Sequence, residues 1–260
     1  MAFAETVNPA IYLSLFLSRE MRPKGQLRLR ESVDPMSEQL ILTLDGSAME
    51  FHVRRVLVAG YTGRDASQVR AHIEELERQG IPAPESFPAV YPIDSSWTTT
   101  ESELVVARPR VSGEAEPALL FRGDGVDDLD DALVSVIVDF TDREEERRSI
   151  PRSKLLPKPL SQRVWRYCDV KELWDEIALR SWVDPGPNGQ FYQSGTLAQL
   201  LPPLDLLARL GLTDGLEGTV LLMGTLPLCT NEFSFSEYFS CELETPEHSK
   251  LTYECRIRRS

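Results

Sequence analysis

The sequence predicts an α+β fold with a β-dominated core. Short apolar runs punctuated by proline recur from residue 81, strand-like runs return from residue 218, and only a few segments show helical periodicity. The chain of 260 residues is long enough to bury a substantial core, and its 42% apolar and 27% charged residues are typical of a soluble globular protein. We therefore expect strands to outnumber helices.

The charge balance narrows the classes of partner. The formal net charge is −13, so the chain lacks the basic excess that nucleic acid or an anionic membrane surface requires. No apolar run approaches the roughly 18 residues that a membrane-spanning helix needs. We expect neither nucleic acid nor a membrane as the main partner.

The cysteines indicate a reduced, cytoplasmic protein. They are widely spaced, contain no C-x-x-C pair and follow no secretory signal, which argues against disulfides and against a zinc site built on thiolates. We expect them to be buried as small apolar side chains. The four cysteines are Cys168, Cys229, Cys241 and Cys255.

Residues 1–36 are predicted to form an amino-terminal extension. A short apolar stretch at residues 10–17 precedes several basic residues, which leaves an organellar transit peptide as an alternative. Glu5, Glu20 and Glu31 argue against it, because transit peptides avoid acidic residues. We expect a flexible arm over residues 1–36 and a single domain over residues 37–260.

Two elements begin the predicted domain. Residues 39–44 and 49–59 predict a hairpin whose turn is Asp45-Gly46, a pair that favours tight turns between strands. The following segment predicts a helix that begins after the N-cap residue Asp65 and ends at Gly80. Its apolar face is expected to carry Val69, Ile73 and Leu76.

Further helices and strands are predicted along the rest of the chain. An acidic loop at residues 123–131 precedes a predicted strand at residues 132–138. Residues 168–182 predict a second amphipathic helix, and residues 194–210 predict a third that is interrupted at Pro202-Pro203. The second helix is expected to be capped by Asp169 and to bury Leu173, Trp174 and Ile177.

Three carboxylates form the first candidate site. Glu114 and Glu116 occupy alternate positions, so in an extended strand both side chains lie on one face. Asp139 ends an apolar run, where a strand would deliver it to the edge of a sheet. Carboxylates without His or Cys are the ligands that Mg²⁺, Mn²⁺ or Ca²⁺ prefer. The alternative is a solvated strand face without a metal.

A histidine on the first helix is the second candidate. His72 and Glu75 lie three residues apart, so a helix places them side by side, and the carboxylate could orient the imidazole for general base catalysis. Of the other two histidines, His52 falls in a predicted strand and His248 in a polar loop. An ordinary boundary histidine is the alternative interpretation of His72.

Lys154 follows a run of charged residues at 139–148 that we expect to be mostly solvated. Leu155, Leu156 and two prolines come directly after Lys154, so a rigid apolar segment is expected to hold its ammonium. There it could stabilise an enolate or a carboxylate beside a metal. Gly224-Thr225 interrupts another apolar run, which is typical of a backbone that approaches a ligand closely.

The order of the motifs is more specific than any one of them. Along the chain they are VLVAGYTGRD, a helix with H-x-x-E, PAPESFPAVYPIDSS, E-x-E, an aspartate with an arginine four residues later, a lysine, a Gln-x-Gly-Thr turn and GTVLLMGTLP. This order resembles the fumarylacetoacetate hydrolase superfamily. The runs AGYTGRD, HIEELERQGIPAP, TDREEE, SKLLPKP, LRSW and GTLAQLLPP are more similar to an uncharacterised branch of it, and the likeness covers residues 39–258.

The resemblance implies a fold and a set of site residues. The fold would be a mixed β-roll with a few peripheral helices, assembled as a homodimer, with Mg²⁺ (or Mn²⁺/Ca²⁺) at the end of the β-structure. The matching positions are Glu114, Glu116 and Asp139 for the metal, Arg143, Thr225 and Tyr61 for the substrate, and His72, Glu75 and Lys154 for catalysis.

The implied function is hydrolysis of a C–C bond in a dicarbonyl or acylpyruvate-type small molecule, through a metal-bound enolate. Decarboxylases, tautomerases, isomerases and catalysts of cyclisation remain alternatives on the same fold. This chain has Ile137-Val138-Asp139-Phe140 where the branch tends to have Gly-Ser-Asp-His. The apolar neighbours of Asp139 favour a further alternative, a metal-free and non-catalytic dimeric relative.

Overall fold

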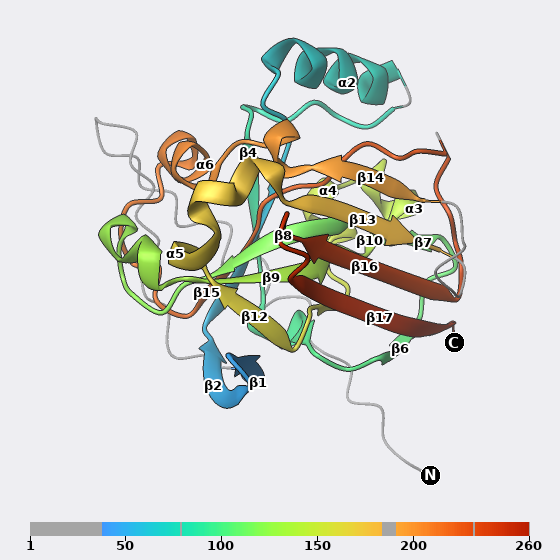
Figure 1. Ribbon diagram of the computed structural model, residues 1–260. Helices are drawn as coiled ribbons and strands as arrows, with labels where there is room; N and C mark the ends of the chain where they lie inside the picture. The colour runs from blue at the N-terminus through green and yellow to red at the C-terminus, as the bar shows by residue number, and fades with distance from the viewer. Residues whose placement is uncertain (1–37, 79, 184–190, 231, 260) are drawn as a thin grey trace. The chain divides into compact units, whose positions relative to one another are not determined.

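The computed structural model describes residues 38–78, 80–183, 191–230 and 232–259, apart from the side chain of His72. The arm predicted for residues 1–36 lies outside the described residues and stays a prediction. Two sheets carry most of the strands (Figure 1). The larger has the strand order β2-β1-β12-β9-β8-β15-β3-β4 and the smaller the order β14-β13-β16-β17-β6.

Both sheets mix strands from distant parts of the sequence. The larger sheet consists of β1 (Glu38–Leu44), β2 (Ser47–Val53), β3 (Arg55–Gly60), β4 (Ala89–Ile93), β8 (Ala115–Leu120), β9 (Leu133–Val138), β12 (Arg163–Arg166) and β15 (Thr219–Leu222). The smaller consists of β6 (Glu103–Val106), β13 (Ala178–Trp182), β14 (Gln193–Thr196), β16 (Tyr238–Glu244) and β17 (Lys250–Arg259). Two short pairs join β5 (Thr98–Thr99) to β11 (Lys158–Pro159) and β7 (Val111–Ser112) to β10 (Thr141–Asp142).

The described helices are few and short, as the sequence predicts. The α-helices are α2 (Ala66–Arg78), α3 (Arg143–Glu146), α4 (Ile150–Ser153), α5 (Tyr167–Val170) and α6 (Pro203–Leu210). The 3₁₀ helices are η1 (Ser95–Trp97), η2 (Val126–Asp131), η3 (Lys171–Glu176) and η4 (Leu197–Gln199). None of the helices in the described part of the chain has both the length and the apolarity needed to cross a membrane.

The central strands of the larger sheet are buried on both faces. All six residues of β8 and all six of β9 are buried, and their side chains alternate between two clusters. Leu119 and Val134 belong to the cluster shared with the five-stranded sheet, whereas Leu120 and Leu133 belong to the cluster on the opposite face. The second cluster also joins residues of β1 and β2 to residues of β3 and β4, at opposite ends of the strand order, so the sheet curls around it.

The first predicted hairpin is confirmed at its turn. Asp45 and Gly46 have φ angles of 52° and 78°, the left-handed conformation that a two-residue hairpin turn requires and that this pair tolerates. The second strand is shorter than the predicted span of residues 49–59. It ends at Val53, and after Arg54 the chain continues in β3, where it pairs with β15 and β4.

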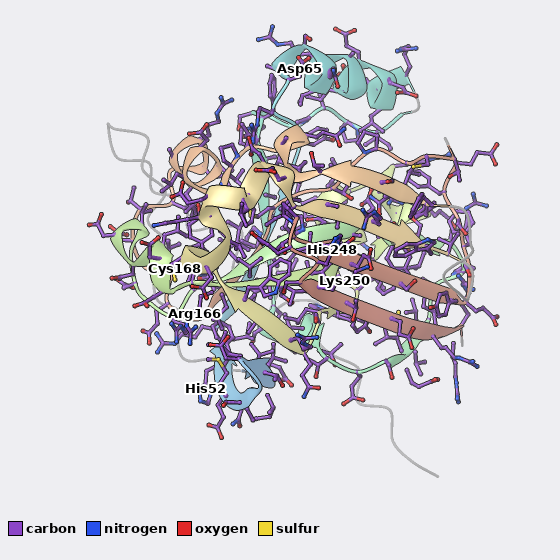
Figure 2. The ribbon with its side chains drawn as sticks, viewed as in Figure 1. His52, Asp65, Arg166, Cys168, His248 and Lys250 are labelled. Atoms are coloured by element: carbon purple, nitrogen blue, oxygen red, sulfur yellow. The ribbon has the colours of Figure 1, made fainter. Side chains whose placement is uncertain are left out.

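The predicted helix after Asp65 is confirmed. The Asp65 carboxylate accepts hydrogen bonds from the backbone N–H groups of Ser67 and Gln68 at 2.8 and 3.3 Å, which caps α2. Gly80 follows the helix with a φ of 85°, a conformation that favours glycine. Figure 2 shows Asp65 at one end of the helix.

Two other predicted helices are wrong in part. Residues 168–182 form α5, η3 and then the strand β13, because Ala178–Trp182 pairs with β14 and β16. Asp169 does not cap α5, whose N-cap is Arg166. The span 194–210 begins as strand β14, continues in the 3₁₀ helix η4 and is α-helical only after Pro202. In both segments the pairing within the five-stranded sheet overrides the local helical pattern.

The prediction for the cysteines is half right. Cys241 and Cys255 are buried, whereas Cys168 and Cys229 are exposed. All four are free thiols. Figure 2 shows Cys168 near Arg166.

Part of the predicted acidic loop at 123–131 is the 3₁₀ helix η2. Asp128 supports this helix by accepting hydrogen bonds from the backbone N–H groups of Asp124 and Gly125.

Candidate metal centre

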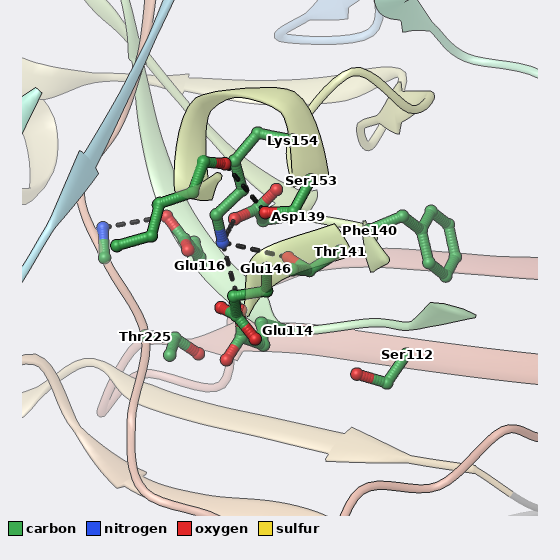
Figure 3. Close-up of polar contacts among 12 residues, drawn as sticks. Ser112, Glu114, Glu116, Asp139, Phe140, Thr141, Glu146, Ser153, Lys154 and Thr225 are labelled. Carbon is green, nitrogen blue, oxygen red and sulfur yellow. Dashed lines mark hydrogen bonds and ion pairs between the residues drawn. The ribbon is translucent and has the colours of Figure 1, made fainter. Parts of the chain in front are cut away.

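The backbone ladder brings the three predicted carboxylates together. Strands β8 and β9 pair in antiparallel fashion, and beyond their ends Glu114 and Asp139 exchange backbone hydrogen bonds of 3.1 and 2.8 Å. Glu116 lies two residues further along the same strand. One oxygen from each of Glu114, Glu116 and Asp139 lies within 4.8 Å of the others. These three residues, the carboxylate cluster, are shown in Figure 3.

Glu116 is the most unusual carboxylate of the cluster. Its side chain is buried, and burial followed by the charge of Asp139 raises its pKa well above the usual range. Its Oε2 accepts a 2.8 Å hydrogen bond from the backbone N–H of Gly224. Gly224 has a φ of 94°, and a Cβ at this position would collide with the side chain of Thr62. Glycine is therefore required where the backbone meets Glu116.

Lys154 donates directly into the cluster. Its Nζ lies 2.5 Å from Asp139 Oδ2, 2.9 Å from Thr141 Oγ1 and 3.5 Å from Glu114 Oε2 (Figure 3). Burial alone would lower the pKa of this ammonium, but the charges of Asp139 and Glu114 outweigh burial, so the pKa is raised. The two carboxylates therefore stabilise the protonated form of Lys154.

A second lysine, Lys158, also lies at the cluster. No pattern in the sequence predicted a role for it. It is fully buried, and its Nζ donates to the carbonyl oxygens of Phe140 and Leu156 at 2.9 and 3.0 Å. The same Nζ lies 3.1 Å from Asp139 Oδ1. Burial lowers the pKa of Lys158 to about 8, although Asp139 opposes this. The sequence feature that could have identified Lys158 is its position between two prolines in SKLLPKP.

Arg143 and Glu146 complete the charged surroundings. The Arg143 side chain is buried, and its Nε donates to Ser112 Oγ at 2.6 Å. Its Nη2 lies 3.0 Å from Glu114 Oε1, and its Nη1 donates to both oxygens of Glu146. The ring of Phe233 covers the guanidinium at 3.9 Å. Arg143 and Glu145 are buried, so the charge run that the sequence predicts to be mostly solvated turns partly inward.

A buried glutamine positions the strand that carries the E-x-E pair. Gln193 Oε1 accepts hydrogen bonds of 2.8 Å from the backbone N–H of Ala115 and from Ser181 Oγ. Its Nε2 donates to Thr225 Oγ1 at 2.5 Å and to the carbonyl of Leu226 at 2.9 Å. Thr225 in turn donates to the carbonyl of Ala115 at 2.8 Å. Gln193 starts the Gln-x-Gly-Thr turn in the sequence, but its contacts depend on the fold.

The apolar neighbours of Asp139 do not enter the cluster. Ile137 and Val138 belong to the two cores on either face of β9. Phe140 packs edge-on against Phe239, with ring centroids 6.1 Å apart, and Figure 3 shows its ring turned away from the carboxylates. The apolar residues beside Asp139 therefore do not separate the three carboxylates.

The remaining predicted site residues are Tyr61, His72 and Glu75, and the structure does not describe the side chain of His72. Tyr61 is partly buried with a φ of 59°, and burial raises its pKa to about 12, with smaller effects from Tyr91, Glu146, Lys154 and Glu114. The backbones of His72 and Glu75 lie on α2, as predicted. The side chain of His72 lies outside the described part of the structure, so the role predicted for the His72–Glu75 pair stays a prediction.

The family of the chain follows from a model match. The model for a protein of unknown function, DUF2848, matches residues 59–254. The chain belongs to this family. The prediction of an uncharacterised branch is thereby confirmed. No curated protein gives a significant match to the sequence.

Solved structures confirm the fold. Fumarylpyruvate hydrolase from Pseudomonas aeruginosa, in complex with Mn²⁺ and pyruvate, has 16% identity and a TM-score of 0.63 over 90% of this chain and 100% of that one. A Yersinia pestis protein assigned to the fumarylacetoacetate hydrolase family has 15% identity and a TM-score of 0.60 over 85% and 100%. 5-Carboxymethyl-2-hydroxymuconate delta-isomerase from Mycobacterium smegmatis has 18% identity and a TM-score of 0.55 over 80% of each chain. The predicted fumarylacetoacetate hydrolase-like, β-dominated fold is confirmed.

Proposed function

We propose that this protein is a divalent-metal-dependent hydrolase that cleaves a C–C bond in a dicarbonyl or acylpyruvate-type small molecule. The convergence of Glu114, Glu116 and Asp139 beside the ammonium of Lys154 carries the proposal. The Pseudomonas aeruginosa hydrolase of the same fold, solved with Mn²⁺ and pyruvate, supports this class of cation and of small oxo acid.

The residues of the cluster fit a hard divalent cation. All candidate ligand atoms are carboxylate oxygens, the type that Mg²⁺, Mn²⁺ and Ca²⁺ prefer. Asp139 Oδ1 is buried, and its described partner is the ammonium of Lys158 at 3.1 Å. When bound, the cation polarises a carbonyl oxygen and stabilises the negative charge that develops there.

The chain's own residues would hold and orient the substrate. Lys154 would supply a positive charge beside the cluster and stabilise negative charge on the substrate. We assign substrate contacts to Arg143, Thr225 and Tyr61. His72 would take a proton from the attacking water, with Glu75 orienting the imidazole.

An isomerase or tautomerase is the second candidate. The delta-isomerase from Mycobacterium smegmatis has the same fold, and fold does not determine the reaction. In that case the same residues would move a proton on the substrate without hydrolysis. The metal-free alternative is less well supported, because the three carboxylates converge instead of splaying into solvent. A homodimer and a cytoplasmic location stay predictions.

Calorimetric titration of Mg²⁺ and Mn²⁺ tests the cation site first. We expect the wild type to bind at least one of them and the Glu116→Gln variant to lose this binding. Glu144→Gln is the matched control, because Glu144 is an exposed residue of α3 that pairs only loosely with Arg148, at 3.9 Å. A wild type that binds neither cation, with or without oxalate, would favour the metal-free alternative.

Product analysis separates the two enzymatic candidates. Incubation with acylpyruvates and Mn²⁺ should release pyruvate if the protein is a hydrolase, and Glu116→Gln should abolish the release. Conversion between enol and keto forms without pyruvate would show an isomerase instead. A variant at His72 that still released pyruvate at the wild-type rate would remove this residue from the mechanism.

A further inference from the structure

The positive charge of Arg143 is already compensated by the protein. Two carboxylates flank its guanidinium: Glu114 Oε1 lies 3.0 Å from Nη2, and both oxygens of Glu146 lie 3.0–3.1 Å from Nη1. Ser112 accepts from Nε, and Phe233 covers one face of the plane. An arginine paired in this way meets a substrate as part of a neutral or acidic group, and it lacks the free charge that binds a carboxylate in bidentate fashion.

Glu146 is the glutamate of its run that faces the site. Glu144 is exposed, with its carboxylate 3.9 Å from Arg148, and Glu145 forms a 3.0 Å ion pair with Arg152. Glu146 lies one helical turn after Arg143, and Figure 3 shows its carboxylate beside Glu114 and close to Lys154. Burial is the main cause of the raised pKa of Tyr61, and Tyr91 and Glu146 add to it. The charge of Glu146 therefore acts on Tyr61, which we assign to substrate contact.

The charges of the site set a limit on the charge of the substrate. The carboxylate cluster and Glu146 bring four acidic groups, and Arg143, Lys154 and Lys158 bring three basic ones. A divalent cation bound at the cluster would leave one positive charge in excess. One carboxylate on the substrate neutralises it, whereas a second one placed beside Arg143 would also lie beside the oxygens of Glu146, which are 3.0–3.1 Å from Nη1. Like charges at close range in a poorly hydrated site repel strongly.

We propose that Glu146 determines substrate specificity, by pairing with Arg143 and so selecting 2-oxo acids with a single carboxylate against those with a second, distal one. This inference rests on the proposed function, because it assumes that a cation at the cluster holds the 2-oxo acid end of the substrate. It defines the acylpyruvate-type substrate further: the acyl part is uncharged. It also predicts that a neutral residue at position 146 would free Arg143 to bind a distal carboxylate.

The test compares two ligands that differ only at one end. 2-Oxopentanoate and 2-oxoglutarate have the same five-carbon chain, and only the second has a distal carboxylate. Each is titrated calorimetrically into the full-length protein with saturating Mn²⁺ on both sides. We expect the wild type to bind 2-oxopentanoate at least about tenfold more tightly, and Glu146→Gln to reduce this ratio by at least about tenfold.

Two further variants separate specificity from structural damage. Glu146→Asp keeps the charge and should keep the wild-type preference, and Glu144→Gln removes a charge from the exposed side of α3 and should change nothing. Equal binding of the two acids by the wild type, or the same ratio in Glu146→Gln, would overturn the inference alone. Binding of Mn²⁺ without binding of either acid would overturn the proposed function together with it.

Discussion

Replacement of Gln193 by leucine should damage both the stability and the cation site. Gln193 is fully buried and makes four hydrogen bonds, two of them to the backbone of Ala115 and Leu226. Leucine has a similar volume but leaves the Ala115 N–H and the Leu226 carbonyl without a partner. Each orphaned backbone group costs about 1–3 kcal/mol, so we expect a loss of about 4 kcal/mol in the free energy of unfolding.

The effect on cation binding follows from the position of Ala115. This residue lies between Glu114 and Glu116, and Gln193 anchors its N–H while Thr225 anchors its carbonyl. Loss of an anchor behind metal ligands typically lowers metal affinity by about 10–100-fold, and we expect a loss in this range for Mn²⁺. The Ser181 and Thr225 hydroxyls can rotate to other partners, so the damage should be local.

Denaturant unfolding and Mn²⁺ calorimetry together test this reasoning. A loss of about 4 kcal/mol corresponds to a fall of about 8–16 °C in melting temperature for a domain of this size. Gln162→Leu is the matched control, because exposed Gln162 makes a single 3.2 Å side-chain bond to the carbonyl of Ile41, and it should cost less than about 0.5 kcal/mol. A loss below about 1 kcal/mol in Gln193→Leu, or a folded variant with wild-type Mn²⁺ affinity, would refute the positioning role.

Four other predictions concern the same cluster. Because burial raises the pKa of Glu116, divalent cations should displace a proton from it. The heat of Mn²⁺ binding should therefore vary with the ionisation enthalpy of the buffer, and identical heats in buffers of different ionisation enthalpy would contradict this. In the metal-free protein the same shift makes the free energy of unfolding fall as pH rises from the unfolded pKa of Glu116 towards the folded one, and Glu116→Gln should remove that slope in denaturant titrations. Gly224→Ala should cost about 1–3 kcal/mol from its φ of 94°, and more from the collision with Thr62, with weaker Mn²⁺ binding measured by calorimetry. Phe140→Leu should cost about 1 kcal/mol in unfolding experiments and leave Mn²⁺ affinity unchanged, because the ring packs on Phe239; lost affinity would place Phe140 at the site.

Local chemistry made several features predictable from the sequence. The Asp45-Gly46 turn and the capping of α2 by Asp65 depend on residues adjacent in the chain. The E-x-E pair follows from the two-residue period of a strand, which places both glutamates on one face whatever the strand packs against. Asp139 was expected at the end of a strand because it directly follows an apolar run. Each of these inferences needed information from only a few neighbouring residues.

Tertiary structure decided the environment of every charge at the site. Three consecutive glutamates have three different environments, because each lies on a different side of α3. Glu144 is exposed, Glu145 pairs with Arg152, and Glu146 pairs with Arg143. Lys158 looks like an ordinary lysine in the sequence until the β11–β5 pairing buries it beside Asp139.

Residues that are distant in sequence explain the remaining differences. Gln193 meets Ala115 across 78 positions and Thr225 across 32, contacts that no local pattern encodes. The strand at Ala178–Trp182 forms because β14 and β16 offer backbone partners on both sides, and that gain exceeds the helical preference of its own residues. The sequence by itself determined which residue types could bind a cation. The pairing of β8 with β9 decided that they meet at one point, because the register of a ladder depends on both strands and cannot be derived from either one alone.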